Sequence, residues 1–166
     1  MTGDNLAVAI KQCALALGYE NCGIIRVEEL ADFADRLDER FRFFPDQAEY
    51  GQKYYALACP QQQHPWAKAA VVCVRRYGKY KMPPQLDGRI SKFFLADGRV
   101  NPASPDHQTS LKFEAYLHDI GLRMLTKRTD GVIPLRWAAY KAGLGIIRKN
   151  NFFYTQPVPG CIWRHG

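Results

Sequence analysis

Hydrophobic residues recur at intervals of three and four in four stretches of the chain, which is the spacing of one face of an amphipathic helix. The predicted helices run from Asp4 to Gly18, from Glu28 to Pro45, from Ser104 to Gly121 and from Pro134 to Gly143. Ser104 is a favourable N-cap, and Pro105 is a favourable first residue because its missing N–H has no helical partner there. Glycine ends three of the four helices, since it adopts positive φ without strain.

The same spacing predicts which side chains face the core. The second helix has a stripe of leucine and phenylalanine, made of Leu30, Phe33, Leu37, Phe41 and Phe44. The predicted buried faces of the last two helices are Leu111, Ala115 and His118, and Leu135, Ala138, Ala139 and Ala142. The small residues of the fourth helix predict close packing on a neighbouring element.

Three short runs have the composition of strands, namely Cys22–Val27, Ala69–Val74 and Leu122–Thr126. The continuously apolar run 69–74 predicts a central strand that is covered on both faces. Residues 46–66 show little periodicity, and residues 61–65 within this range are expected to form a surface loop. Amphipathic helices that alternate with short apolar strands predict an α/β (α+β) sandwich, with a mixed sheet flanked by helices. We expect a single domain over residues 1–155, followed by an atypical tail at 156–166.

Composition and charge narrow the classes of protein. The chain of 166 residues is 47% hydrophobic and 13% aromatic, which is typical of a folded domain. Its net charge of +7 favours anionic partners such as tRNA, other RNA, nucleotides or a phosphate-bearing cofactor, although a basic surface without a ligand is an equal alternative. No apolar run approaches the roughly 20 residues that span a bilayer, and the N-terminus lacks a signal-peptide pattern. We therefore expect a cytoplasmic protein that has no membrane segment.

The cysteines do not predict a metal site. None of the five forms a C-x-x-C pair, so the spacing typical of zinc or iron–sulfur ligands is absent from these residues. The odd number and the expected cytoplasmic location argue against a disulfide framework. Cys13 and Cys73 lie in apolar runs and are interpreted as small core residues.

Two polar segments are candidates for binding. After the fourth helix, Gly143 and Gly145 can adopt positive φ, and the turn brings backbone amides near Arg148 and Lys149, an arrangement that suits an anionic or polar cofactor group. The alternative is a tight turn with solvated basic residues.

The segment RRYGKYK, residues 75–81, follows a predicted buried strand, and ligands of open α/β sheets gather at strand ends. Its tyrosines can stack on a ligand, but a solvated basic loop explains the segment equally well.

These segments also carry a family resemblance. AGLGIIRKNN, residues 142–151, resembles the AGLG-x-x-GKN signature of epoxyqueuosine reductases and their relatives, with Arg148 where that family usually has glycine. GYENCGIIRVEEL, residues 18–30, resembles the LGF-x-x-CGI opening of the same family. GRISKFFLA, residues 88–96, resembles its G-x-IA-R-YA segment, and Asp106–His107 resembles the D-Y-H that opens a later helix.

The resemblance implies a reduced nitroreductase-like fold that binds a corrinoid, cobalamin being the implied cofactor. Its implied cofactor-binding residues are Tyr77, Arg89, Lys92, His107, Gly143, Gly145, Lys149 and Asn150. Asp130 matches the acid that donates a proton to the substrate in this family, and a partly buried acid with a raised pKa can do this at neutral pH. The alternative is that Asp130–Gly131 forms only a turn, which this pair favours by itself.

The resemblance covers nearly the whole chain but only the N-terminal part of the family's architecture. The ferredoxin-like module, with its C-x-x-C-x-x-C-x-x-x-C-P spacing and iron–sulfur clusters, has no counterpart in these residues. The expected function is therefore the corrinoid-binding domain of an iron–sulfur oxidoreductase, in a truncated form that is inactive alone. The alternative is a non-catalytic module that binds RNA or a nucleotide. We also expect a homodimer, because apolar surface left bare recruits a partner, and a monomeric elution at high concentration would contradict this.

Overall fold

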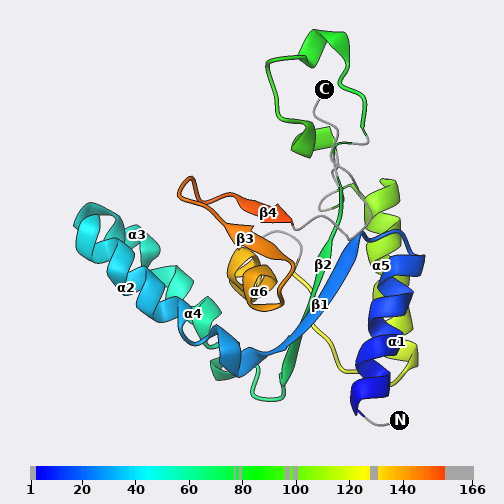
Figure 1. The fold of residues 1–166 in the computed structure, drawn as a ribbon, viewed down its shortest axis with the longest axis horizontal. Coiled ribbons are helices and arrows are strands. Elements are labelled where there is room, and N and C mark those ends of the chain that lie inside the picture. The colour runs from blue at the N-terminus through cyan, green and yellow to red at the C-terminus, as the bar shows by residue number, and fades with distance from the viewer. Residues whose placement is uncertain are drawn as a thin grey trace. The chain divides into compact units, whose positions relative to one another are not determined.

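A computed structural model of the protein describes residues 3–76, 78, 80–95, 98, 101–127 and 131–155 (Figure 1). The α-helices are α1 (Gly3–Ala16), α2 (Phe33–Phe43), α3 (Ala48–Gly51), α4 (Tyr55–Ala58), α5 (Pro105–Asp119) and α6 (Leu135–Lys141). The strands are β1 (Asn21–Arg26), β2 (Ala69–Val74), β3 (Gly145–Ile147) and β4 (Phe153–Thr155). Six 3-10 turns are also present in the described ranges: Val27–Leu30, Pro45–Gln47, Gln52–Tyr54, Pro60–Gln62, Pro84–Leu86 and Lys92–Leu95. The expected mixture of α and β structure is confirmed.

The strands pair differently from the expectation of one mixed sheet. In the described residues they form two separate two-stranded sheets, β1 with β2 and β3 with β4. β3 and β4 are antiparallel, with Gly145 opposite Thr155 and Ile147 opposite Phe153. Hydrogen bonds from Glu20 to Val74 and from Val27 to Lys68 lie at the two ends of the β1–β2 pair, which is therefore also antiparallel. Because β2 has one neighbouring strand in the described residues, the prediction of a central strand is wrong. Ala70 and Val72 are buried, and Val71 and Cys73, which alternate with them, are half-buried.

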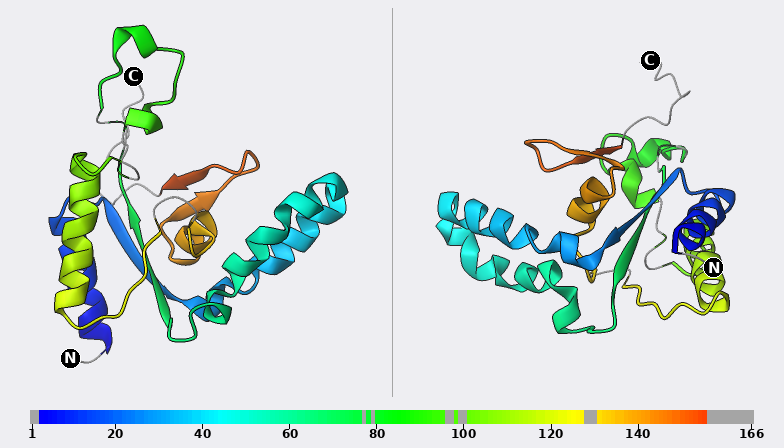
Figure 2. Two further views of the ribbon diagram at one scale, coloured as in Figure 1. Left: turned by 180° about the vertical axis from the view of Figure 1, so that it is seen from behind. Right: turned by 60° about the horizontal axis from the view of Figure 1, so that its bottom comes forward.

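The chain divides into two compact units, the first made of residues 1–22 and 73–132 and the second of 23–72 and 133–166. In the first unit α1 lies beside α5, as Figures 1 and 2 both show. The ring of Tyr19, just after α1, packs against Phe113 of α5 with ring centroids 5.7 Å apart. Ser104 caps α5 as predicted, because its Oγ accepts a hydrogen bond from the His107 N–H at 3.1 Å.

The buried face of α5 differs from the predicted one. Phe113, Leu117 and Asp106 are buried, whereas Leu111, Ala115 and His118 are exposed. The helix carries apolar residues on two sides, and periodicity alone does not select the side that meets α1. Residues 122–126 after this helix are irregular, so the predicted strand there is wrong.

In the second unit α2 packs against α4. Leu30 and Leu37 of the predicted stripe are buried, but Phe44 at its end is exposed. The range 46–66, which shows little periodicity, contains the short helices α3 and α4 together with 3-10 turns. No apolar periodicity marks them, because each helix is only four residues long. Among the described helices, none has the length and apolar character needed to cross a membrane.

Candidate functional site

The predicted site residues lie in different parts of the chain. Gly143, Gly145, Lys149 and Asn150 all belong to the segment that joins α6 to β3 and β4, in the second unit. Arg89, Lys92 and His107 belong to the first unit. Tyr77 and Asp130 lie outside the described residues.

The turn after α6 is closed by its own backbone. Pro134, predicted as the first helical residue, is the N-cap, so the helix begins one residue later at Leu135. Leu135 is exposed, while Ala138 and Ala139 are buried. Gly143 has a φ of +70°, as predicted. The Gly143 N–H donates to the Tyr140 carbonyl and the Leu144 N–H to the Ala139 carbonyl, both at 3.0 Å. These bonds form a Schellman motif, so the amides that were expected to face a ligand already satisfy the end of the helix.

Two of the segments that carry the family resemblance pack directly against each other. Gly23, in the CGI segment of β1, is buried against Ala142 and Leu144 of the AGLG segment. A Cβ atom at Gly23 would lie 3.2 Å from both terminal methyl groups of Leu144 and closer still to the Ala142 methyl. Only glycine allows this approach, so the two motifs form one packing unit although they lie far apart in sequence.

Gly145 has a different role from the one predicted. It is the first residue of β3 rather than a positive-φ turn residue. A Cβ atom here would overlap the Tyr154 carbonyl oxygen and lie 2.7 Å from the Phe153 ring. The absence of a side chain at Gly145 therefore lets β4 close against β3.

Asn150 shapes the hairpin turn between β3 and β4. Its side-chain oxygen accepts from the Phe152 N–H at 3.1 Å, and its amide group donates to the Tyr154 hydroxyl at 2.9 Å. Asn151, with a φ of 59°, completes a three-residue loop whose base is the bond from the Arg148 N–H to the Phe152 carbonyl. Lys149 is exposed within this loop.

One side of this hairpin is exposed and apolar. Ile146 and Tyr154 are opposite one another in the register, so their side chains point to the same side. Arg148 and Phe152, two residues further toward the loop, extend this side because side chains alternate along a strand. All four are exposed, Phe152 to 65%, and the Arg148 guanidinium lies 5.7 Å from the centre of the Tyr154 ring. We call this set of four residues the open hairpin face; Figure 2 shows the hairpin from two directions.

Asp32 fixes α6 to the start of α2, an interaction that sequence reasoning missed. Its carboxylate accepts a hydrogen bond from the Trp137 indole N–H at 2.8 Å and forms an ion pair with Lys141. Burial alone would raise the pKa of Asp32, but the bonds from Lys141 and Trp137 outweigh it and lower that pKa below its ordinary value. The helix that precedes the Gly143 turn is thereby held at both Trp137 and Lys141.

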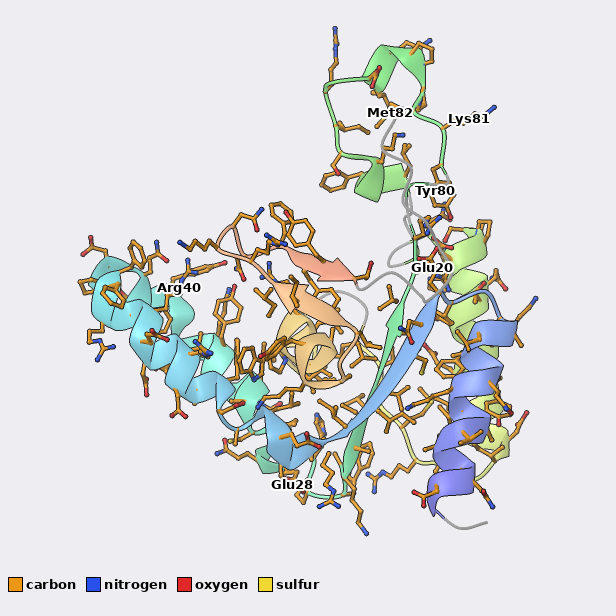
Figure 3. All side chains as sticks on the ribbon, in the orientation of Figure 1. Glu20, Glu28, Arg40, Tyr80, Lys81 and Met82 are labelled. Atoms are coloured by element: carbon orange, nitrogen blue, oxygen red, sulfur yellow. The ribbon has the colours of Figure 1, made fainter. Side chains whose placement is uncertain are left out.

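In the first unit, the start of the basic segment 75–81 is not a solvated loop. Arg75 forms an ion pair with Asp106 of α5 and lies over the Tyr19 ring, 4.5 Å from its centre. The Tyr80 hydroxyl donates to the second oxygen of Asp106 at 2.8 Å. Arg76 pairs with Glu20 at 2.8 Å. Figure 3 labels Glu20 and Tyr80 in this region. These contacts explain why a carboxylate is buried at Asp106.

The remaining predicted residues of the first unit have structural or exposed positions. The His107 Nδ1 lies 3.1 Å from the Gly98 carbonyl oxygen, and its backbone N–H is the one capped by Ser104. Arg89 and Lys92 are exposed in the segment that includes the 3-10 turns 84–86 and 92–95. Four of the predicted residues therefore lie near the hairpin of the second unit, whereas these three belong to the first unit.

A second exposed group of residues lies at the far end of α2 and on the elements that follow it. Three cation–aromatic pairs with exposed rings occur there, Arg40 over Phe44, Arg42 over Phe43 and Lys53 over Tyr50, with charge-to-centroid distances of 5.9, 5.6 and 4.0 Å. All three rings are exposed. Figure 3 labels Arg40 at this place. The charged residues here were not predicted as candidates. Phe44 was assigned to the core because its spacing continues the helical stripe, and Phe43 was not part of that stripe.

The described residues contain no group of three or more histidine, cysteine, aspartate or glutamate side chains that could hold a metal ion. A hollow of about 520 Å³ beside the end of α5 is lined by His118, Gly121, Leu122, Arg123 and Met124, none of which is a predicted site residue. Comparison with protein-family models, with curated proteins and with solved structures found no match.

Proposed function

We propose that this chain is the corrinoid-binding domain of an iron–sulfur oxidoreductase similar to epoxyqueuosine reductases, with a reduced nitroreductase-like fold. The observation that supports it best is the direct packing of Gly23 on Ala142 and Leu144. A chance resemblance gives no reason for the glycine of one motif to pack on the alanine and leucine of the other. The Schellman turn and the glycine-dependent hairpin likewise give each glycine of the AGLG segment a physical role.

The residues around the hairpin fit a corrinoid in their chemistry. The open hairpin face offers apolar surface to a flat macrocycle, and Arg148 and Lys149 offer positive charge to the phosphate of a nucleotide tail. The turn amides do not contribute, since the helix end uses them. In this proposal Phe152 and Tyr154 contact the ring, and Lys149 and Arg148 hold the anionic tail.

When bound, the corrinoid would supply the reducing centre, and the protein would supply position and electrostatics. Asp130, assigned through the family resemblance, would donate a proton to the substrate. Electrons would come from iron–sulfur clusters held outside these 166 residues, because the sequence of these residues contains no cluster-binding spacing.

Titration of the purified chain with cob(II)alamin, followed by visible absorption, tests this proposal. We expect a saturable spectral shift that weakens at least ~10-fold in Lys149→Ala and in Phe152→Ala, in line with loss of a phosphate contact or an aromatic contact. Lys112→Ala, an exposed lysine on α5, is the matched control and should bind as the wild type does. Absence of any shift from a chain that circular dichroism shows to be folded would refute the proposal.

A second candidate function, RNA binding without catalysis, is favoured by the three cation–aromatic pairs beyond α2. Exposed rings flanked by cations suit single-stranded nucleic acid, because bases stack on the rings while the cations neutralise phosphates. This basis differs from the segment 75–81 singled out in the sequence, whose Arg75 and Arg76 are engaged in ion pairs.

Fluorescence anisotropy with a labelled single-stranded RNA, across a series of salt concentrations, tests the second candidate. We expect affinity to fall steeply with salt, and the double variant Phe43→Ala/Tyr50→Ala to lose about 1–3 kcal/mol of binding free energy per stacked base. Leu15→Ala, which removes an exposed apolar side chain from α1, should leave binding unchanged. Equal affinities of the double variant and the wild type would exclude this surface.

A further inference from the structure

Two cysteines that are far apart in the sequence meet in the first unit. Cys22 lies on β1 and Cys73 on the neighbouring strand β2, and their sulfur atoms are 3.7 Å apart. Cys22 is only 5% exposed, and Cys73 is half-buried. Both are free thiols. Neither thiol has a role in the proposed corrinoid or RNA site.

The two thiols are not equivalent. The Cys73 S–H donates to the Cys22 sulfur, and this hydrogen bond lowers the pKa of Cys22; burial opposes the shift, and Lys11 adds to it. The same bond, together with burial, raises the pKa of Cys73. Cys22 is therefore the thiol of the pair with the lower pKa. A nucleophilic thiolate beside a protonated thiol is the arrangement in which an oxidised cysteine can be resolved into a disulfide.

The backbone also permits a bond between them. Side chains that face each other on paired antiparallel strands have Cβ atoms about 4.5–5.5 Å apart, close to the roughly 3.5–4.5 Å of a disulfide. The sulfur atoms are already in contact, so a small side-chain rotation and a small approach of the strands would suffice.

We propose that Cys22 and Cys73 form a redox-active dithiol that a hydroperoxide converts into an intramolecular disulfide. The Cys22 thiolate attacks one peroxide oxygen, the O–O bond breaks, and hydroxide leaves while Cys22 becomes a sulfenic acid. The Cys73 sulfur then attacks the Cys22 sulfur, and the sulfenic hydroxyl departs as water with the Cys73 proton. In total, two thiols and one hydrogen peroxide give one disulfide and two molecules of water, so the cysteines are oxidised and the peroxide is reduced.

The bond would join β1 and β2 close to the ion pair between Glu20 and Arg76. Cys22 follows Glu20 by two residues, Cys73 precedes Arg75 and Arg76 by two and three residues, and Arg76 pairs with Glu20 at 2.8 Å. A disulfide here would hold the ends of β1 and β2 together and restrict the unfolded chain. We therefore expect the oxidised protein to have a higher Tm than the reduced protein.

The test uses the wild-type chain and a variant that keeps only this pair, with Cys13, Cys59 and Cys161 changed to serine. Removing Cys13 matters because it is close enough to influence the pKa of Cys73. Each protein is treated with hydrogen peroxide and alkylated, then analysed by intact mass and by peptide mapping without reductant. We expect each chain to lose two alkylatable thiols and the mass of two hydrogen atoms. The peptide map should contain a crosslinked Cys22–Cys73 peptide, and dithiothreitol should reverse both changes fully.

Two single changes in the same background separate the roles of the thiols. In Cys73→Ser, dimedone should trap a sulfenic acid on Cys22; in Cys22→Ser, Cys73 loses the hydrogen bond to Cys22, but burial still raises its pKa, so it should react more slowly than Cys22 does in Cys73→Ser. If the wild-type map shows both residues alkylated, or linked only to other chains, while the other cysteines are already oxidised, the proposal is overturned. The wild-type map gives this answer even if a serine variant does not fold.

Discussion

Asp106→Ala tests whether the contact with Arg75 holds the first unit together. Asp106 is 5% exposed; its carboxylate pairs with Arg75 and accepts the Tyr80 hydroxyl at 2.8 Å. Alanine would leave the Arg75 guanidinium, on a side chain that is 16% exposed, without this carboxylate. One nitrogen of that guanidinium, Nη2, is already buried without a hydrogen-bond partner among the described residues, so the cation depends strongly on Asp106.

The size of the effect follows from burial. Removing one partner of a buried ion pair costs about 3–5 kcal/mol, because the other charge stays in a poorly solvated place. The partial exposure of Arg75 reduces this cost, whereas the lost hydrogen bond from Tyr80 adds about 1 kcal/mol. We expect the free energy of unfolding to fall by about 3 kcal/mol, which is a large part of the total stability of a typical domain.

Urea denaturation followed by far-ultraviolet circular dichroism measures this change. Asp119→Ala is the matched control, since Asp119 lies on the same helix with its side chain 79% exposed, and we expect a change within about 0.5 kcal/mol. Asp106→Asn keeps an acceptor for Tyr80 but loses the charge, and its stability should fall between those of the wild type and Asp106→Ala. A loss below about 1 kcal/mol for Asp106→Ala would refute the reasoning from a buried ion pair.

Three further predictions concern the helix ends and the hairpin. Gly145→Ala should reduce stability by about 1–3 kcal/mol, because the added methyl group overlaps β4, as measured by thermal unfolding. The ion pair of Asp32 should make the wild type more stable than Asp32→Asn. The folded pKa of Asp32 lies below its unfolded value of about 3.9, so this advantage should be complete above about pH 5 and disappear as pH falls through the folded pKa. Ser104→Ala should cost about 1 kcal/mol in urea denaturation through loss of the cap on the His107 N–H.

Each of these predictions has a control on the same element. Gly143→Asn should be tolerated far better than Gly145→Ala, because asparagine accepts the positive φ of Gly143 and its side chain meets open space. Ser104→Asp should retain the stability that Ser104→Ala loses, since aspartate also caps. Equal losses of stability for the two glycine variants would contradict the overlap with β4. Equal losses for the two serine variants would contradict the capping role of Ser104. A stability difference between the wild type and Asp32→Asn that stays unchanged down to pH 2 would contradict the role of the Asp32 ion pair.

Local sequence signals predict the positions of most helices and strands. The continuous apolar run predicts the observed bounds of β2, and the glycine, serine and proline signals locate α1, α5 and α6 to within two residues. Such signals act between residues close in the chain, so they need no knowledge of the fold. The same signals fail for α3 and α4, which are too short to show a period, and for residues 122–126, whose alternation has no partner strand in the described residues.

The site was predicted less well than the helices. Asn150 and Lys149 lie in the hairpin loop, as their polar character indicates, but the amides of the preceding turn serve the end of α6. Gly145 is needed for strand packing and not for a turn. The sequence alone does not tell whether a glycine is needed for a turn or for close strand packing. Only the position of the neighbouring strand distinguishes these two roles.

The sequence by itself determined where chain segments become helical or extended, how helices begin and end, and that the surface carries a net charge of +7. The tertiary structure decided the partners: Gly23 with Ala142, Arg75 with Asp106, and Cys22 with Cys73. Periodicity and capping arise from contacts within a few residues. These pairs join residues that are tens of positions or more apart in the chain. Many alternative tertiary folds are compatible with the same local pattern, so the sequence pattern does not select among them.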